Sequence, residues 1–514
     1  MHNRRKRDIA GGLRGDSGGN IAGGQDIGHR RRYGAVLAGL ALIACLPARA
    51  GWSELAALER SGARVTAAAV DLVDDRMISG LNAGARLTPA SLTKLTLTAA
   101  ALETWPADKS FKTQLLSGGK LKEGALDGDL ILQGAGDPSL DDHSLWSLAA
   151  QLRGAGVTSI SGRLIVSSAP FGLVACETED RCKALDRSDT AYNAPLSAIG
   201  VDFGSWCISV RPGAIGAPAA VRGCGVMALP VAIEGTIRTV SASSRQTFWI
   251  ERVTRDGSDV LRVGGDVPVD RGQELYRAMS NPANGVGLLF REILREIGIR
   301  IDGAVQVTAA PSPQPLEILA EYEGLTLREQ LGRMLRFSNN YIADVLTLNL
   351  AAELSGQPPA QLSTAGNVLV DFVTRAQRAV QIGKSETPPA IFSGSGLTPE
   401  NLLSANDLVS LLAYQYRDSR RFPAFYGGLT VPRDAPFQFL RNGSPAWLDR
   451  VALKTGTMEM PHSVCGIAGY MRKRDNGWIA FAVIVNGGEG LPHVPISRAM
   501  NAARADLEKI LEQN

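Results

Sequence analysis

A serine and a lysine three positions apart could form the reactive pair of a hydrolytic site. The segment Ser91-Leu92-Thr93-Lys94 carries them. On a helix, side chains at positions i and i+3 lie on one face, so the lysine amine can reach the serine hydroxyl. In a partly desolvated site with another cation nearby, the pKa of a lysine falls. The amine can then act as the base that activates a serine nucleophile.

The same spacing occurs in a second segment, Ser117–Lys120, where two glycines separate the serine from the lysine. Consecutive glycines favour a turn, which cannot hold both side chains on one rigid face. Pro89-Ala90, in contrast, stand where a helix begins, and apolar residues follow them at helical spacing up to about residue 105. The sequence therefore favours Ser91 and Lys94 as the competent pair.

Ser338-Asn339-Asn340 lies between two segments with helical patterns. A hydroxyl at Ser338 could relay a proton between a lysine and a leaving group, and the amide of Asn340 could hold a substrate carbonyl. A serine here is also typical of a helix cap, so the motif alone leaves both interpretations open. The same spacing recurs at 404–406, where Asp407 completes the pattern of a capping box.

Lys454-Thr455-Gly456-Thr457 occurs once, on a segment with the alternating pattern of a strand. The lysine cation suits a substrate carboxylate, and Gly456 lets the backbone approach a ligand closely. The edge of such a strand could hold an extended peptide through main-chain hydrogen bonds. A strand that ends in a turn with a solvated lysine is the alternative interpretation.

The elements that would position these motifs include both helices and strands. Helical patterns cover 53–60, 90–105, 284–297, 325–337, 341–354 and 495–512, and strand patterns cover 64–81, 450–456, 464–471 and 478–486. Residues 108–277 are instead rich in glycine and short β-type runs. We therefore predict an α/β (α+β) catalytic domain split into 51–107 and 278–514, interrupted by a β-rich insert at 108–277 that is large enough for two subdomains.

Composition and charge argue against several classes of protein. The chain has 514 residues, of which 45% are hydrophobic and 20% are charged, as in a globular protein rather than a collagen-like, coiled-coil or disordered one. The total charge is +3, but residues 1–50 alone carry +6, so the remaining chain carries −3. It shows no basic block that would favour nucleic acid. The five histidines are too scattered for a zinc site, so we expect no metal.

The N-terminal segment 1–50 has the order of a secretory signal peptide. A basic cluster at 29–32 precedes an apolar run at 35–46, and a small-residue cleavage pattern follows. We therefore expect export to the periplasm. The apolar run is too short to favour a membrane anchor. Two alternatives stay open: the basic cluster is compatible with twin-arginine export, and Leu42–Cys45 resembles a lipoprotein box, which would lipidate Cys45.

Four of the six cysteines form two local pairs in the predicted insert. They are Cys176 with Cys182 and Cys207 with Cys224. In an exported chain, close pairs favour disulfides, and free buried thiols are the alternative. Cys465 lies in an apolar strand-like run, which predicts a small core residue.

The motifs Ser-x-x-Lys, Ser-x-Asn and Lys-Thr-Gly occur in this order in penicillin-binding proteins and serine β-lactamases. The chain most closely resembles the class C low-molecular-mass penicillin-binding proteins, which are D-alanyl-D-alanine carboxypeptidases and endopeptidases. Three further segments carry the likeness: Asp129–Leu140 with its Gly-Asp-Pro, Tyr192–Ala198 and Gly394–Leu397. The long gap between the first two motifs also matches this family, because β-lactamases have far fewer residues there.

The resemblance implies a transpeptidase domain of the penicillin-binding-protein and serine β-lactamase fold, working through an acyl-enzyme. Ser91 would be the nucleophile, Lys94 its general base and Ser338 the group that passes a proton to the leaving nitrogen. Backbone N–H groups of Ser91 and Thr457 would form the oxyanion hole. Substrate contacts would come from Asn340, Lys454, Thr455, Gly456 and Thr457.

The resemblance also implies the partners, namely peptidoglycan stem peptides and β-lactam antibiotics. We expect no cofactor, no nucleic acid, and a membrane only if Cys45 is lipidated. Two positions depart from the family pattern: Ser393 replaces the Asp before Gly-Ser-Gly-Leu, and Asn339 stands where Asp is common. The first departure puts in doubt any role for that carboxylate. The alternatives are a β-lactamase or esterase with the same site, a non-catalytic envelope-binding protein, and a scaffold whose motifs are coincidental.

Overall fold

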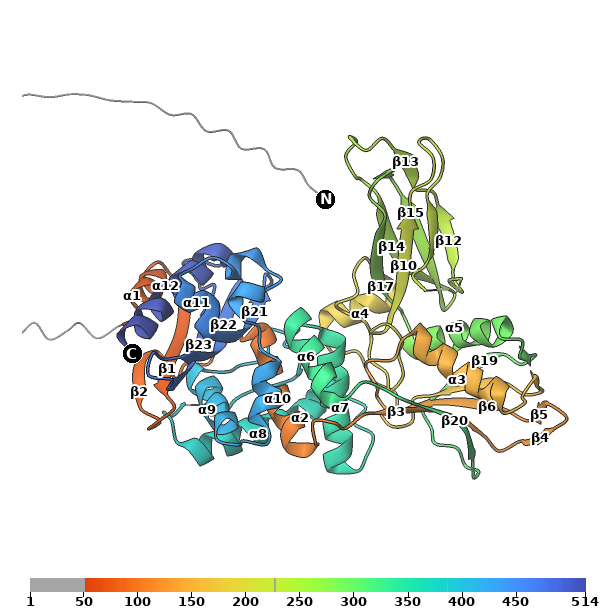
Figure 1. The fold of residues 1–514 in the computed structure, drawn as a ribbon, viewed down its shortest axis with the longest axis horizontal. Coiled ribbons are helices and arrows are strands. Elements are labelled where there is room, and N and C mark those ends of the chain that lie inside the picture. Colours follow the sequence, from red (N-terminus) through yellow and green to blue (C-terminus); the bar gives the residue numbers. More distant parts are fainter. Residues whose placement is uncertain (1–50, 226–227, 386) are drawn as a thin grey trace, which may run out of the picture. The chain divides into compact units, whose positions relative to one another are not determined.

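The computed structural model describes residues 51–225, 228–385 and 387–514 (Figure 1). The predicted signal segment 1–50, with Cys45, lies outside the described residues. Within the described ranges, no helix is both long enough and apolar enough to span a bilayer. The described chain mixes helices and sheets, and the predicted α/β fold class is confirmed.

The main sheet brings the two ends of the described chain together. Its strands, in spatial order, are β2 (Met77–Leu81), β1 (Arg64–Asp71), β23 (Trp478–Asn486), β22 (Val464–Arg472) and β21 (Val451–Met458). All neighbours are antiparallel, and Ala67 of β1 lies opposite Val483 of β23. β21, which carries the Lys-Thr-Gly motif, is an edge strand. One side of this motif is therefore available to a ligand.

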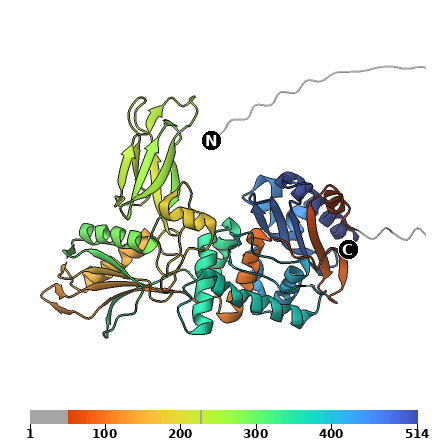
Figure 2. The same ribbon diagram turned by 180° about the vertical axis from the view of Figure 1, so that it is seen from behind.

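Alternate residues of the main sheet enter two hydrophobic cores on its opposite faces, as the period of a strand requires. One face packs against the helices α1 (Ser53–Arg60), α11 (Pro445–Arg450) and α12 (Ile496–Gln513). The other core contains α2 (Thr93–Thr104), α6 (Leu327–Phe337), α7 (Asn340–Ser355), α8 (Leu362–Val380), α9 (Ala405–Tyr416) and α10 (Phe422–Gly427). Figure 2 shows the same arrangement from behind.

α2 is enclosed on all sides, since every residue from Thr93 to Leu102 is buried. A helix that is buried all round carries few charged groups, and Lys94 is the exception. The predicted helix over 90–105 is confirmed, with a short 3₁₀ turn at Ala90–Leu92 before it.

The insert contains two groups of sheets. In the first group, one sheet has β19 (Val305–Thr308), β8 (Leu164–Ser167), β6 (Leu130–Gly134), β3 (Lys112–Ser117) and β20 (Glu317–Glu323). The other has β18 (Arg300–Ile301), β7 (Ser159–Ile160), β5 (Ala125–Asp127) and β4 (Lys120–Lys122). The helices α3 (Asp142–Gly154) and α5 (Pro282–Glu296) share their hydrophobic core.

The second group has shorter sheets. They are β11 (Ala220–Gly223), β10 (Ser205–Arg211) and β17 (Gln273–Ala278); β12 (Ala232–Gly235), β15 (Ser258–Gly264), β14 (Trp249–Arg255) and β9 (Arg187–Ser188); and the pair β13 (Arg238–Val240) and β16 (Asp266–Pro268). The helix α4 (Glu179–Asp186) precedes β9.

The insert sheets extend beyond residue 277, where the sequence placed the return to the catalytic domain. β18, β19 and β20 pair with β7, β8 and β3, so residues up to Glu323 belong to these sheets. Periodicity identifies a strand but not its neighbour in the sheet, so the pairing of these three strands could not be predicted from the sequence.

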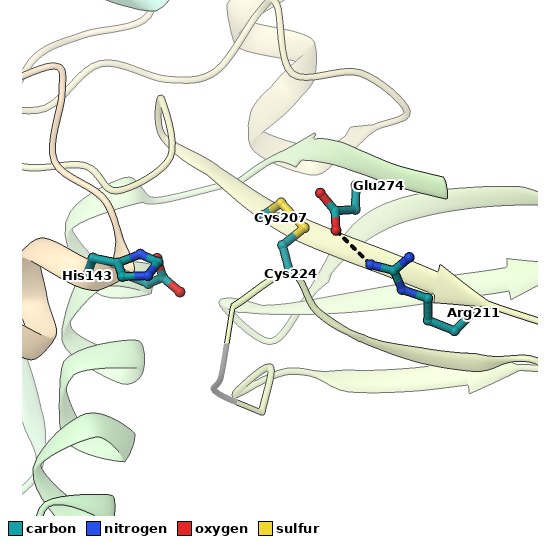
Figure 3. The surroundings of a disulfide bond; sticks show 6 residues. His143, Cys207, Arg211, Cys224 and Glu274 are labelled. Atoms are coloured by element: carbon teal, nitrogen blue, oxygen red, sulfur yellow. Dashed lines mark hydrogen bonds and ion pairs between the residues drawn. A yellow bond between two sulfur atoms is a disulfide. The ribbon is translucent and has the colours of Figure 1, made fainter. Parts of the chain in front are cut away.

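Both predicted cysteine pairs are joined by disulfide bonds in the structure, Cys176–Cys182 and Cys207–Cys224. The first bond connects the middle of α4 to the loop before it. The second ties β10 to the residue after β11, beside the Arg211–Glu274 ion pair of 2.9 Å (Figure 3). Cys465 is a buried free thiol on β22.

Candidate active site

Ser91 lies in the 3₁₀ turn that leads into α2. Ala90 before it has a left-handed backbone, with φ of 47°, which is strained for a residue other than glycine. The turn brings the Ser91 hydroxyl to the lysine that follows on the first turn of α2. The distance between Lys94 Nζ and Ser91 Oγ is 3.0 Å, so the predicted pair is in contact.

Lys94 is completely buried and makes three hydrogen bonds. Besides Ser91 Oγ, its Nζ donates to Oδ1 of Asn340 at 2.8 Å and to the main-chain oxygen of Ser395 at 2.6 Å. Two of these partners can only accept a hydrogen bond, whereas the hydroxyl can also donate. A neutral amine has two N–H donors and one lone pair, so this set of partners suits a neutral lysine that accepts the proton of Ser91.

The Ser-x-Asn motif forms the connection between α6 and α7. Ser338 ends α6 in a left-handed conformation, with φ of 54°, and is therefore not the N-cap of the next helix. That cap is Asn339, whose side chain accepts from the N–H of Ile342 at 2.9 Å. Asn and Asp cap helices equally well, which explains why Asn339 can replace Asp at this position. Ser338 and Asn340 are left free to face the other two motifs.

Lys454 connects the second motif to the third. Its Nζ donates to Ser338 Oγ at 3.0 Å and to the main-chain oxygen of Thr455 at 2.7 Å. The side chain is buried, whereas that of Thr457 is exposed. Beyond the isolated bridge between Thr430 and Leu453, no described strand pairs with this edge of β21. An extended peptide could therefore add along the edge of the motif.

Gly456 allows β21 to lie directly against the turn of Ala90–Leu92, which carries Ser91. A Cβ at this position would come within 2.5 Å of the Pro89 main-chain oxygen and 3.1 Å of the Leu92 nitrogen. Because these are backbone atoms, neither can move aside without displacing the turn. The glycine is thus required for contact between the first and third motifs.

The electrostatic surroundings of the two lysines keep their pKa values low. Burial is the main cause that lowers the pKa of Lys94 well below its usual value, and the nearby Lys454 adds to the effect. Arg181 also lowers it, whereas Asp344 raises it. Burial lowers the pKa of Lys454 to about 7. A lowered pKa favours the neutral amine, which is the form that can accept a proton.

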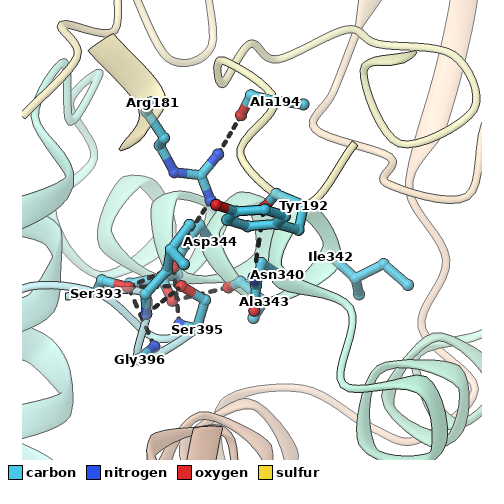
Figure 4. A network of polar contacts seen from close by, with 12 residues as sticks. Arg181, Tyr192, Ala194, Asn340, Ile342, Ala343, Asp344, Ser393, Ser395 and Gly396 are labelled. Atoms are coloured by element: carbon cyan, nitrogen blue, oxygen red, sulfur yellow. Dashed lines mark hydrogen bonds and ion pairs between the residues drawn. The ribbon is translucent and has the colours of Figure 1, made fainter. Parts of the chain in front are cut away.

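Sequence reasoning missed a buried ion pair beside the site. Asp344 on α7 and Arg181 on α4 lie 2.5 Å apart, and neither side chain is exposed by more than 3% (Figure 4). Asp344 also accepts hydrogen bonds from Ser393 Oγ at 3.1 Å and from the N–H of Ser395 at 2.8 Å. The only signal in the sequence was an acidic residue inside an apolar helix four positions after Asn340.

These contacts give Ser393 a physical role. It occupies the position where the family commonly has Asp, and its hydroxyl binds the carboxylate of Asp344. The loop of Gly394–Leu397 thus has a carboxylate partner, although the charge comes from another element. The structure brings all three predicted motifs together: Lys94 binds Ser91 and Asn340, and Lys454 binds Ser338 in a second set of hydrogen bonds.

Comparisons with known proteins show what this chain is similar to. The D-alanyl-D-alanine carboxypeptidase of Actinomadura sp. (strain R39) is 28% identical over 462 residues, covering 85% of this chain and 80% of that protein. The D-alanyl-D-alanine carboxypeptidase DacB of Haemophilus influenzae is 26% identical over 432 residues, covering 83% of this chain and 86% of that protein.

A solved structure shares the fold. The crystal structure of penicillin binding protein 4 (dacB) from Haemophilus influenzae matches with a TM-score of 0.70 at 22% identity, covering 88% of this chain and 99% of its own. The family model described as the D-Ala-D-Ala carboxypeptidase 3 (S13) family matches residues 52–507, nearly the whole described chain. The chain therefore belongs to the D-Ala-D-Ala carboxypeptidase 3 (S13) family and is a serine-type peptidase.

Proposed function

We propose that this protein is a D-alanyl-D-alanine carboxypeptidase that acts on peptidoglycan stem peptides through an acyl-enzyme on Ser91. The observation that carries the proposal is the buried Lys94 amine, 3.0 Å from Ser91 Oγ, among partners that match a neutral base. Both curated relatives bear the name of this activity.

In the proposed reaction, Ser91 Oγ attacks the carbonyl carbon of the penultimate D-Ala, and its proton passes to Lys94. The peptide C–N bond then breaks. Ser338, whose oxygen accepts a hydrogen bond from Lys454, gives its own proton to the leaving nitrogen and takes one from Lys454 in return. The proton gained by Lys94 later replaces the one lost by Lys454, so both lysines regain their starting states. Water hydrolyses the ester and restores the Ser91 hydroxyl.

Substrate binding uses the remaining motif residues. The cation of Lys454 and the hydroxyls of Thr455 and Thr457 hold the terminal carboxylate, and Gly456 keeps the strand close to the nucleophile. Asn340 holds the peptide. N–H groups of Ser91 and Thr457 stabilise the oxyanion, as in related enzymes with backbone oxyanion holes. The unpaired edge of β21 also suits a longer, cross-linked peptide, so the proposal includes D,D-endopeptidase action.

A β-lactam ring presents the same kind of carbonyl, and we propose that it acylates Ser91. The test is the intact mass of the purified protein after incubation with benzylpenicillin, followed by peptide mapping. We expect one lasting adduct on the Ser91 peptide, none in Ser91→Ala, and release of D-Ala from a pentapeptide that ends in D-Ala-D-Ala.

Other results of this experiment would favour other functions. Hydrolysed penicillin without a lasting adduct would indicate a β-lactamase. Intact penicillin and no adduct from folded protein would indicate a non-catalytic binding protein. Labelling of Ser91→Ala at the normal rate would refute the assignment of the nucleophile.

We further propose that residues 1–50 are a cleaved signal segment and that the protein works in the periplasm. The order of basic, apolar and small residues supports this, and so do the two disulfides, which suit an oxidising compartment. We also propose that the catalytic domain resumes after Glu323, because the last strand that joins the insert sheets ends there. N-terminal sequencing of the exported protein tests the cleavage site.

A further inference from the structure

The proposed general base is held by groups outside its own helix. Of the three partners of Lys94 Nζ, Asn340 Oδ1 and the Ser395 main-chain oxygen can only accept hydrogen bonds. These two partners turn the amine so that its third position faces Ser91. Each of them is in turn held by a contact from the insert, within the segment 181–194.

The first contact runs through a buried ion pair. Arg181 Nη2 lies 2.5 Å from Asp344 Oδ2, and the other oxygen of Asp344 accepts the N–H of Ser395 at 2.8 Å. Figure 4 shows Arg181, Asp344 and Ser395 in this order. Because the Ser395 backbone is fixed on its N–H side, its carbonyl is fixed toward Lys94.

The second contact sets the orientation of an amide. Asn340 Nδ2 donates to the main-chain oxygen of Tyr192 at 3.3 Å, which leaves its oxygen to face Lys94. Arg181 also donates through Nη1 to the main-chain oxygen of Ala194, so the two contacts are tied to each other within the insert (Figure 4).

We propose that segment 181–194 of the insert positions the catalytic lysine, with Arg181 as the principal positioning residue acting through Asp344. The inference rests on the proposed function of Lys94 as general base. It gives the insert an indirect role in the reaction: its residues hold the groups that orient Lys94 and do not touch the reacting atoms themselves.

The charges around Lys94 give this role a signature that a purely structural role lacks. Lys454 faces it from β21, Asp344 from α7 and Arg181 from α4, and Tyr341 on α7 lies near Arg181. Asp344 raises the pKa of Lys94 and Arg181 lowers it. Loss of Arg181 therefore raises the pKa of Lys94, and loss of Asp344 lowers it. When both charges are lost, the two effects on this pKa largely cancel.

The test is the rate of acylation of the full-length protein by benzylpenicillin as a function of pH. The variants are Arg181→Gln, Arg181→Lys, Asp344→Asn and the double variant Arg181→Gln/Asp344→Asn. We expect Arg181→Gln to lower the rate about ten-fold near pH 7, less than the roughly 10²- to 10⁴-fold that a general base contributes. We also expect it to move the acid limb, the pH range over which Lys94 becomes protonated, to higher pH. Asp344→Asn should move the limb to lower pH. The double variant should return the limb to its wild-type position while its rate stays low, and Arg181→Lys should recover part of the rate.

A matched control is the buried pair of Arg86 and Asp407, whose side chains are 4% and 1% exposed and which touches none of the motifs. Arg86→Gln should lower the melting temperature but leave the pH profile unchanged.

Folded Arg181→Gln with wild-type rate and profile would overturn the inference. If that variant does not fold, the double variant decides, since it leaves no unpaired buried charge; a wild-type rate in it would also overturn the inference. Absence of acylation in the wild type would instead refute the proposed function itself.

Discussion

The two buried lysines of the site are held in different ways. Lys94 binds three oxygen atoms from Ser91, Asn340 and Ser395, and two positive side chains and one negative side chain lie near it. Lys454 binds two oxygen atoms, one of them on the adjacent residue, and burial alone lowers its pKa. The first environment prescribes both the position and the protonation state of an amine. The second environment makes fewer contacts to its amine, which belongs to the edge strand β21.

The comparison predicts that Lys94 is the more costly lysine to lose. Lys94→Met removes the base and should lower acylation by benzylpenicillin about 10³- to 10⁴-fold, near the upper end of general-base effects. Since burying an amine that is charged in the unfolded chain opposes folding, the melting temperature should stay the same or rise. Stopped-flow acylation and thermal unfolding measure both effects.

The control for this variant is Lys473→Met. Lys473 lies outside the three motifs, and its amine forms an ion pair with Asp71 at an N–O distance of 3.0 Å. It should lose stability and keep its activity. A Lys94→Met protein that acylates within ten-fold of the wild type would show that another group is the base.

Lys454→Met should lower the acylation rate about 10²-fold, which is less than the loss in Lys94→Met. The reason is that it removes one electrostatic contact rather than the base. The pH profile sharpens the distinction. The pKa of Lys454 is about 7, so its cation is lost as the pH rises through about 7, and binding of a carboxylate should weaken there. This alkaline limb should be absent from the variant.

The free energy of unfolding should also depend on the protonation of Lys454. It should increase with pH, whereas binding of a carboxylate should weaken. Between about 7 and its usual pKa of 10.5, Lys454 is neutral in the folded protein and protonated in the unfolded chain. The unfolded state then binds more protons, so stability rises with pH in this window. Urea unfolding at several pH values measures the slope, and Lys454→Met should reduce it. An unchanged slope would contradict the low pKa.

The two lysines are brought together by the close contact at Gly456. Gly456→Ala should push β21 away from the nucleophile turn, lower acylation about ten-fold, and destabilise the fold by about 1–3 kcal/mol, as overpacking does. Gly332→Ala on α6 is the control, since a Cβ there meets nothing within 4 Å. Equal behaviour of the two alanine variants would disprove the requirement for a close approach.

The smallest expected effect concerns the two disulfide bonds of the insert. Replacing either pair with serine should cost roughly 2 kcal/mol of stability. Loss of Cys176–Cys182 should also lower acylation a few-fold, because Cys182 is adjacent to Arg181, whereas loss of Cys207–Cys224 should not. Melting curves and acylation rates of both double-serine variants compare them directly. If both variants lose activity alike, the effect reports general stability.

The sequence by itself determined the local features of this protein. The spacing of Ser91 and Lys94, the helix that carries them and the strands of the C-terminal part depend on residues close together in the chain, and all are present in the structure. Local spacing and hydrophobic period encode such features directly. The order of the three motifs then indicated the family, which the match over residues 52–507 confirmed.

Tertiary structure alone decided which distant groups meet. The pairing of Arg181 with Asp344, the use of the Ser395 carbonyl to hold Lys94, and the addition of β20 to the insert sheet join residues far apart in sequence. No periodic pattern encodes them, because a buried charge or a main-chain oxygen selects its partner only after the surrounding elements have packed and excluded water. The motifs thus specify the reacting groups, and the packed fold determines the charge and orientation of the lysine among them.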